Sequence, residues 1–389
     1  MSRQPLIAIK EPVADASAAG TARAAAPERD DRVQQQSLLH RFMGRPESAS
    51  IAGALLVFAI FGYAASGSGM FALDGILNWQ TVAAYLGIIS IGACLLMIGG
   101  EFDLSMGSMI GFAGMMIAIP PLYFHWPVWL SVLVAFVGCL ALGWLNGYLV
   151  IKTRLPSFIV TLAFLFILRG LSLALSIHFT NRTIVSGIGA LAAEDWLAGA
   201  LFVGTVGEDL FNWLAAHGMV AMTSDGTPVV HGVPKVILWW GVLLVCSSLV
   251  LSFTRIGNWI YAVGGDANAA KNVGVPVKAV KTSLFMFTAF CACLFATLQV
   301  CDIGSAAADR GLQKEFEAII AAVIGGTLLT GGYGSVVGAS VGALIFGVVQ
   351  IGITYTDANS DWFRVFLGLM LLVAVIFNNF VRRRVTESR

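Results

Sequence analysis

Two carboxylates lie between apolar runs in the stretch IGGEFDLSMGS, from Ile98 to Ser108. An acid at membrane depth costs about 2.5–3.5 kcal/mol at a helix centre, so Glu101 and Asp103 should face protein or water. Asp103 or Ser105 can accept hydrogen bonds from the free amides that open the next helix, where negative charge is also favourable. We favour this capping role for Asp103 over direct contact with a substrate.

A basic residue, Arg169, lies inside the apolar segment LFILRGLSL and needs an acidic partner. Glu101 and Asp103 are the candidates, and we favour a structural ion pair over a substrate-binding arginine. Polar residues in other apolar segments either line a path through the membrane or form hydrogen bonds between helices, and both readings stay open: Asn146, Ser157 and Thr161.

Other site chemistries find no support in the sequence. Most of the six cysteines lie in apolar segments, and Cys291 and Cys293 would point to nearly opposite sides of a helix, so we expect packing roles rather than disulfides or a metal site. The five histidines show no ligand spacing. No glycine-rich loop ending in Lys-Ser or Lys-Thr is present, so we expect no cofactor on this chain. No nucleophile–base pair indicates an enzyme.

The composition places these residues in a membrane protein. The chain is 58% hydrophobic and 12% charged, whereas about a quarter of the residues of a soluble domain are charged. Apolar stretches near the length needed to cross a bilayer recur, and only helices or closed barrels satisfy the backbone there. We predict an all-α polytopic membrane protein with ten spans, at 50–66, 79–99, 105–123, 128–150, 157–177, 236–253, 282–300, 316–330, 333–352 and 362–380.

Lys and Arg residues predict the orientation. Most of the 23 basic residues fall in segments that share one side when the N-terminus is inside, which places both termini in the cytoplasm. Residues 1–49 are predicted to be a disordered cytoplasmic arm, 50–380 the transmembrane domain with an outer loop at 178–235, and 381–389 a basic tail. The net charge of +1 gives no indication of nucleic-acid binding.

Two segments resemble each other. IGGEFDLSMGSMIG at 98–111 and IGGTLLTGGYGSVVG at 324–338 both begin Ile-Gly-Gly and reach Gly-Ser before an apolar span. Their predicted orientation is the same, so a duplication would be a parallel repeat. A chance likeness between glycine-rich segments stays open as the alternative. Glycines four residues apart, Gly143/Gly147 and Gly334/Gly338/Gly342, predict close helix packing.

A polar loop at 255–281, RIGNWIYAVGGDANAAKNVGVPVKAVK, predicts a short docking helix. Asp266 is a good N-cap for a helix from Ala267 to Val273, Gly274 suits the position after its end, and Pro276 blocks continuation. Two turns are not stable alone in water, so the helix must pack against the protein or a partner.

The chain resembles the permease subunits of bacterial ABC importers for simple sugars, of the ribose, xylose and galactose type. Four segments carry the resemblance: GGEFDLSMGS (99–108), GWLNGYLVIKTRLPSFIVTLAFLFILRGLSL (143–173), the 255–281 loop and VIGGTLLTGGYGSVVGASVGAL (323–344). The family usually has a glycine and an aliphatic residue where this chain has Glu101 and Phe102, which makes Glu101 the better candidate for a special role.

The resemblance implies partners and a location. They are a second, identical permease chain, an ABC ATPase subunit that binds the ATP, a periplasmic sugar-binding protein and the bilayer of the bacterial inner membrane. The ATPase would receive the coupling helix, formed by Asp266, Asn268, Ala269, Ala270 and Gly274. Two alternatives stay open: a branched-chain amino acid ABC permease and a self-sufficient secondary transporter.

Overall fold

The computed structural model describes residues 47–224, 226–356, 359, 361–370, 372–373 and 376. These residues belong to one compact unit that extends from Met43 to Arg389. The predicted basic tail and almost all of the predicted N-terminal arm lie outside the described residues, as does part of the predicted span 362–380, which is helical at 362–370.

Seven helices are long and apolar enough to cross a membrane, and each coincides with a predicted span. They are α3 (Leu73–Ile98), α4 (Met106–Phe124), α5 (Val128–Thr153), α6 (Ser157–Thr180), α10 (Lys235–Phe253), α13 (Val277–Ile303) and α15 (Val336–Tyr355). Another helix, α2 (Glu47–Ala64), is apolar from Ser50 onward but shorter in that part.

The predicted span 316–330 is not one continuous helix. Its helix, α14 (Lys314–Ile324), has 11 residues, which is about 16 Å of helix against a hydrocarbon core of about 30 Å. The two glycines that follow, at 325 and 326, end it, and a non-helical loop continues to Ser335. The apolar composition continued past the helix end, which is why the sequence suggested a longer segment.

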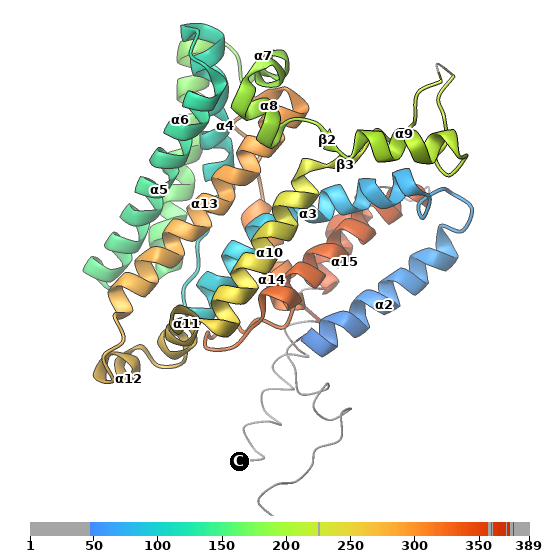
Figure 1. Cartoon of the computed structure of the whole chain (residues 1–389). Coiled ribbons are helices and arrows are strands. Elements are labelled where there is room, and N and C mark those ends of the chain that lie inside the picture. The colour runs from blue at the N-terminus through green and yellow to red at the C-terminus, as the bar shows by residue number, and fades with distance from the viewer. Residues whose placement is uncertain are drawn as a thin grey trace, which may run out of the picture. The chain divides into compact units, whose positions relative to one another are not determined.

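Short elements gather at the two ends of the bundle (Figure 1). At one end, which we call the α7 end, lie α7 (Ile188–Glu194), α8 (Trp196–Phe202), and α9 (Glu208–Ala216). There β1 (Ile184–Ser186) pairs with β4 (Ser305–Ala307), and β2 (Thr205–Val206) with β3 (Val233–Pro234), both antiparallel. At the other end, the α12 end, lie α11 (Arg255–Gly265) and α12 (Ala267–Asn272).

Glycines allow neighbouring helices to touch through their backbones, as predicted for Gly143 and Gly342, whereas Gly334 lies before the start of α15. A Cβ atom on Gly143 of α5 would lie 2.7 Å from the Phe285 carbonyl oxygen of α13, and one on Gly342 of α15 would lie 2.0 Å from the Ala321 carbonyl oxygen of α14. Both distances are too short for a real side chain. The central helices α3, α4, α13 and α15 are therefore mostly buried within the bundle.

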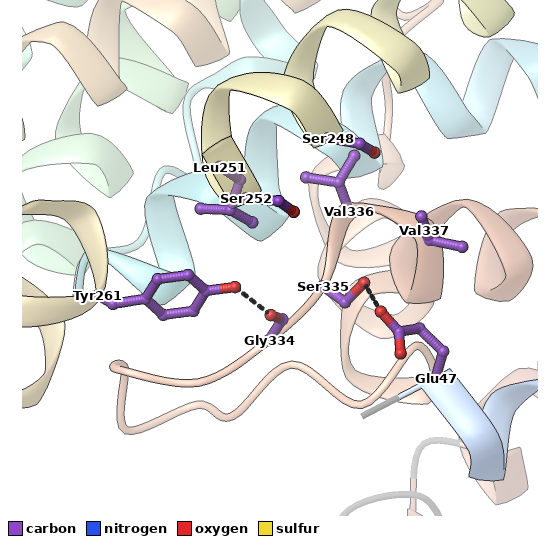
Figure 2. Close-up of a pocket in the computed structure, with 9 residues that line it drawn as sticks. All are labelled: Glu47, Ser248, Leu251, Ser252, Tyr261, Gly334, Ser335, Val336 and Val337. Carbon is purple, nitrogen blue, oxygen red and sulfur yellow. Dashed lines mark hydrogen bonds between the residues drawn. The ribbon is translucent and has the colours of Figure 1, made fainter. Parts of the chain in front are cut away.

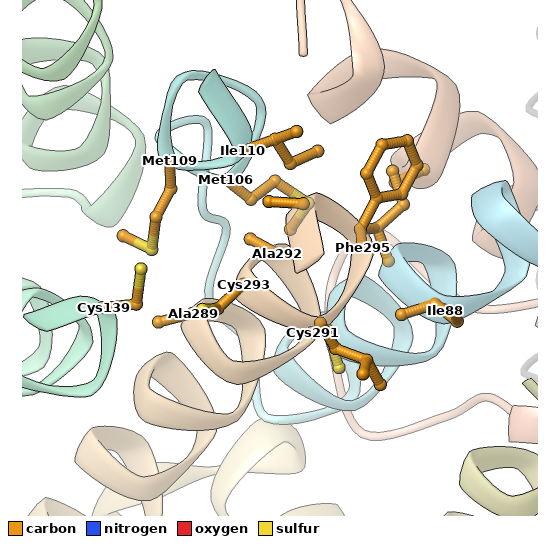
Figure 3. Packing of buried hydrophobic residues seen from close by; sticks show 14 of the residues in the cluster. Ile88, Met106, Met109, Ile110, Cys139, Ala289, Cys291, Ala292, Cys293 and Phe295 are labelled. Carbon is orange, nitrogen blue, oxygen red and sulfur yellow. The ribbon is translucent and has the colours of Figure 1, made fainter. Parts of the chain in front are cut away.

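Five of the six cysteines pack in the interior as predicted, and Cys246 is exposed. All six are free, and five are buried. Figure 3 shows Cys293 of α13 directed toward Cys139 of α5, beside Met109. Cys291 instead contacts α3, where its Sγ atom would lie 3.2 Å from a Cβ on Gly92. Among the described residues no group of three potential ligands could hold a metal ion.

Candidate functional site

The segment from Gly99 to Ser105 re-enters the bundle. α3 ends at Ile98, whose carbonyl oxygen accepts a hydrogen bond of 2.8 Å from the Gly332 amide. The chain then leaves the helix and runs along α6, whose first residue is Ser157. The Phe102 amide donates to Ser157 Oγ and the Leu104 amide to Thr161 Oγ1, both at 3.0 Å. Each step along the segment moves it further from the α12 end.

Two polar contacts fix the depth that this segment reaches. Thr288 Oγ1 donates to Asp103 Oδ2 at 2.9 Å, and Asn146 Nδ2 donates to Ser105 Oγ at 3.0 Å. Thr288 lies about 16 Å from the first residue of α13, and Asn146 about 10 Å from the last residue of α5, at 1.5 Å per residue. Both helix ends lie at the α12 end. α4 therefore begins inside the bundle, and the chain reaches it through the non-helical segment.

Asp103 stabilises the non-helical segment before α4, partly through a contact with α13 that the sequence did not indicate. Its Oδ1 atom accepts from the Ser105 amide at 2.8 Å and from Ser105 Oγ at 2.6 Å. Ser105 is the N-cap residue of α4 but its side chain bonds no amide of that helix. The prediction that one of these two residues accepts from the amides that open the span at 105–123 therefore holds for Asp103, through the Ser105 amide, and not for Ser105. Asp103, 2% exposed, also joins the re-entrant segment to α13.

Glu101 forms an ion pair with Lys281 of α13. The two side chains are 11% and 19% exposed, respectively, so the pair is mostly shielded from solvent. The prediction that Glu101 or Asp103 pairs with Arg169 is wrong, because Glu101 binds Lys281 and Asp103 binds hydroxyl and amide donors. The ion pair thus links the re-entrant segment, near its beginning, to the start of α13, which follows the polar loop that contains the docking helix.

Arg169 acts on a different acid. It is half-buried on α6 and forms no ion pair within 4.0 Å among the described residues, and the buried acid on which its charge acts at longer range is Glu315 of α14. Glu315 is 2% exposed, and its Oε2 atom would lie 1.8 Å from a Cβ on Gly107, so it sits directly on the first turn of α4. Sequence reasoning missed Glu315 because it treated the charged start of KEFEAIIAAVI as the outer end of a span.

The predicted docking helix is present as α12. Asp266 Oδ1 accepts from the amides of Asn268 at 2.8 Å and Ala269 at 3.0 Å, so Asp266 is its N-cap, as predicted. Gly274 has φ of 87°, which suits a glycine just after a helix. The helix ends at Asn272, one residue earlier than predicted.

The surface of α12 separates residues that face outward from one that faces the protein. Asn268 and Ala269 are exposed, whereas Ala270 is 4% exposed. Val273 follows the helix and is 80% exposed. Sequence reasoning missed Val273, although an apolar residue between Asn272 and Gly274 in a polar loop was the available signal.

A cavity of about 300 Å³ lies at the α12 end between α2, α10, α11 and the start of α15 (Figure 2). Ser335 Oγ donates to Glu47 Oε1 at 2.5 Å, and the Tyr261 hydroxyl donates to the Gly334 carbonyl oxygen at 2.8 Å. Burial raises the pKa of Tyr261 to about 12, so the hydroxyl remains a donor. These contacts fasten α2 and α11 to the loop that opens α15.

The sequence is similar to a family of membrane transport components over most of its length. The sequence matches the family described as "Branched-chain amino acid transport system / permease component" over residues 75–375. The xylose transport system permease protein XylH of Escherichia coli (strain K12) is 30% identical, with 86% of this chain and 92% of the relative covered. The ribose import permease protein RbsC of Haemophilus influenzae is 29% identical (80% and 87% covered), and the fructose import permease protein FrcC of Rhizobium meliloti is 29% identical (91% and 91%). No solved structure matches the chain.

Proposed function

The chain belongs to this family of transport-system permease components, and we propose that it is the transmembrane subunit of an ATP-driven ABC importer for a monosaccharide or related polyol. It is a multi-pass protein of the inner membrane and a transport component rather than an enzyme. The observation that carries the sugar assignment is that the xylose, ribose and fructose permeases each cover at least 80% of this chain. The family description itself names branched-chain amino acids, which remain the second candidate substrate class.

The proposed topology places both termini and the α12 end in the cytoplasm. Lys152, Arg154, Arg255 and Lys271 lie at or near that end, which agrees with the positive-inside rule. The chain would cross ten times. The seven long helices, α2 and the segment at 362–380 give nine crossings. α14 with the non-helical stretch before it gives the tenth. The loop at 178–235 would then lie outside.

The coupling loop at 255–281 would receive the ATPase on the exposed side of α12. Asp266 and Gly274 would set the ends of the helix, Asn268 and Ala269 would contact the ATPase, and Ala270 would hold the helix to the permease. α12 leads directly into α13, which carries the partners of Glu101 and Asp103, Lys281 and Thr288. A displacement of α12 by the ATPase would therefore reach the re-entrant segment.

The polar residues of the re-entrant site would act mainly by positioning. Asp103, Ser105, Asn146 and Thr161 bond to one another's segments, and each is at most 2% exposed. They would hold the start of α4 at a fixed depth rather than bind the sugar. Recognition of the sugar would fall chiefly to a periplasmic binding protein that docks outside, and the path would form between this chain and a second, identical copy.

Uptake by the assembled transporter tests this function. Proteoliposomes that hold the permease and its ATPase, with ATP inside and the binding protein outside, should take up a monosaccharide or polyol. Uptake should persist when a protonophore collapses the proton gradient at constant ATP. Uptake of branched-chain amino acids in place of sugars would support the second candidate. Uptake that needs no ATPase, or that the protonophore abolishes, would contradict the ABC assignment.

A further inference from the structure

The stretch between β4 and α14 lies directly on the start of α4. A Cβ atom on Gly311 would lie 1.8 Å from the Gly107 carbonyl oxygen, and one on Gly111 would lie 2.4 Å from the Ala308 carbonyl oxygen. Backbone therefore touches backbone along the first turns of α4. No side chain larger than hydrogen fits at Gly107, Gly111 or Gly311 without moving one of the two segments.

This contact shows how far the stretch between β4 and α14 lies from the α12 end of the bundle. α4 begins about 10–16 Å beyond the α12-end termini of α5 and α13, and Gly107 is its second residue. Gly311 and Glu315 both contact Gly107 and therefore lie at the same depth. The first turns of α4 and α14 meet there, well inside the bundle, and residues 308–313 continue from there without helical structure toward the α7 end.

Polar side chains project from residues 309–314, although these residues lie at membrane depth. Asp309 and Gln313 are exposed, and Arg310 and Lys314 are half-buried. Arg310 Nη2 donates to Ser305 Oγ at 3.1 Å, and Lys314 pairs with Glu317 at 2.5 Å. Non-helical backbone and ionised side chains at membrane depth are tolerated where they are buried in protein or line a water-filled cavity, not where they face lipid.

The backbone at Gln313 is unusual. Four non-glycine residues of the described chain have φ between 51° and 65°, and Gln313 has the largest value, 65°. The other three, His125, Arg154 and Asn181, follow the ends of helices, where this conformation is common. Gln313 instead precedes α14, and its side chain does not cap that helix. Strain of this kind persists where surrounding structure enforces it, often at functional sites.

We propose that the stretch from Asp309 to Lys314 lines the sugar path, and that the side-chain amide of Gln313 forms hydrogen bonds with the hydroxyl groups of the sugar there. This inference rests on the proposed function. A carboxamide can both donate and accept, which suits sugar hydroxyls that do the same. A single neutral amide also binds weakly, so that a sugar can leave toward the cytoplasm. The start of α14 is held in place by the contact of its own Glu315 with Gly107 of α4 and by the Lys314–Glu317 pair.

Water access tests the location without any reference to the substrate. In proteoliposomes, a membrane-impermeant thiol reagent should label Gln313→Cys at a rate well above that of the unmodified chain and its six native cysteines. Val245→Cys is the matched control, since Val245 lies mid-span on α10 and is 57% exposed, but on an apolar surface. It should stay unlabelled. Equal absence of labelling at both positions would overturn the proposed location.

Uptake tests the role of the amide. Gln313→Ala should lower sugar uptake by about fivefold or more, as expected for a lost neutral hydrogen bond, and Gln313→Asn should restore part of it. Labelled Gln313→Cys together with wild-type uptake in Gln313→Ala would overturn the amide's role. If the unmodified transporter takes up amino acids and no sugar, the proposed function fails, and the labelling result still decides where the path lies.

Discussion

Removing two methyl groups from Val273 should weaken the binding of the ATPase subunit by about tenfold. Val273 is 80% exposed on this chain, directly after a docking helix whose exposed residues include Asn268 and Ala269. Val273→Ala removes two carbons worth about 0.8 kcal/mol each when fully buried. Scaled by the exposure that a partner can cover, the loss is about 1.3 kcal/mol, close to the 1.4 kcal/mol that corresponds to a tenfold change in Kd.

The measurement is a titration of purified ATPase subunit against permease in nanodiscs, with binding or ATP hydrolysis as the readout. Val229→Ala is the control, because it is the same substitution on a residue 44% exposed, in the loop after α9. Ala269→Glu should weaken binding further, since it adds charge and bulk on the same exposed face. All three variants should insert and fold normally.

Ala270→Glu separates docking from folding. Ala270 is 4% exposed, so a carboxylate there would be buried against the permease itself and should lower the yield of folded protein. If Val273→Ala and Ala269→Glu both keep the Kd of the unmodified chain within twofold, the ATPase does not bind this face of α12. The coupling assignment would then fail, whatever the family relationship.

Further predictions concern the buried charges. Glu101→Gln and Lys281→Met should each lower the yield of folded permease, since each leaves the partner uncompensated, and the double variant should recover it; a double variant as poor as the worse single one would contradict the pairing. Arg169→Ala should likewise lower the yield, and Glu315→Gln in the same chain should restore it, as measured by monodisperse protein after extraction. Full yield for Arg169→Ala alone would show that this arginine balances no buried acid.

Local features were predictable from the sequence because they depend on neighbouring residues. The docking helix needed an acceptor at Asp266, a few helix-forming residues and a glycine at 274, and the structure contains each of them. The seven long spans were equally visible, since about twenty apolar residues in a row have few alternatives to a membrane helix. The close helix packing followed from glycines spaced four residues apart.

The partners of the charged residues were not predictable, because they depend on contacts between distant parts of the chain. Glu101 and Lys281 are 180 positions apart. Nothing in a single sequence distinguishes Lys281 from Arg169 as the partner of Glu101. The contacts of Asp103 were predicted only in part, for a related reason. Its main contacts include the Thr288 hydroxyl on α13, whereas the sequence showed only the adjacent helix start.

The two glycine-rich segments that resemble each other show why a motif alone did not reveal depth. They meet in the structure, because the Ile98 carbonyl of one accepts from the Gly332 amide of the other at 2.8 Å. They nevertheless lead into their next helices differently. After Gly99 and Gly100, the chain runs into the bundle before α4 begins. After the second segment, α15 starts within a single turn of Tyr333. The difference lies in the acids: Glu101 and Asp103 have partners on α13 that hold a non-helical backbone inside the bundle, and the second segment has Thr327 and Leu329 in their place. A carboxylate between two membrane spans is therefore best explained here as an attachment that keeps a helix start at depth.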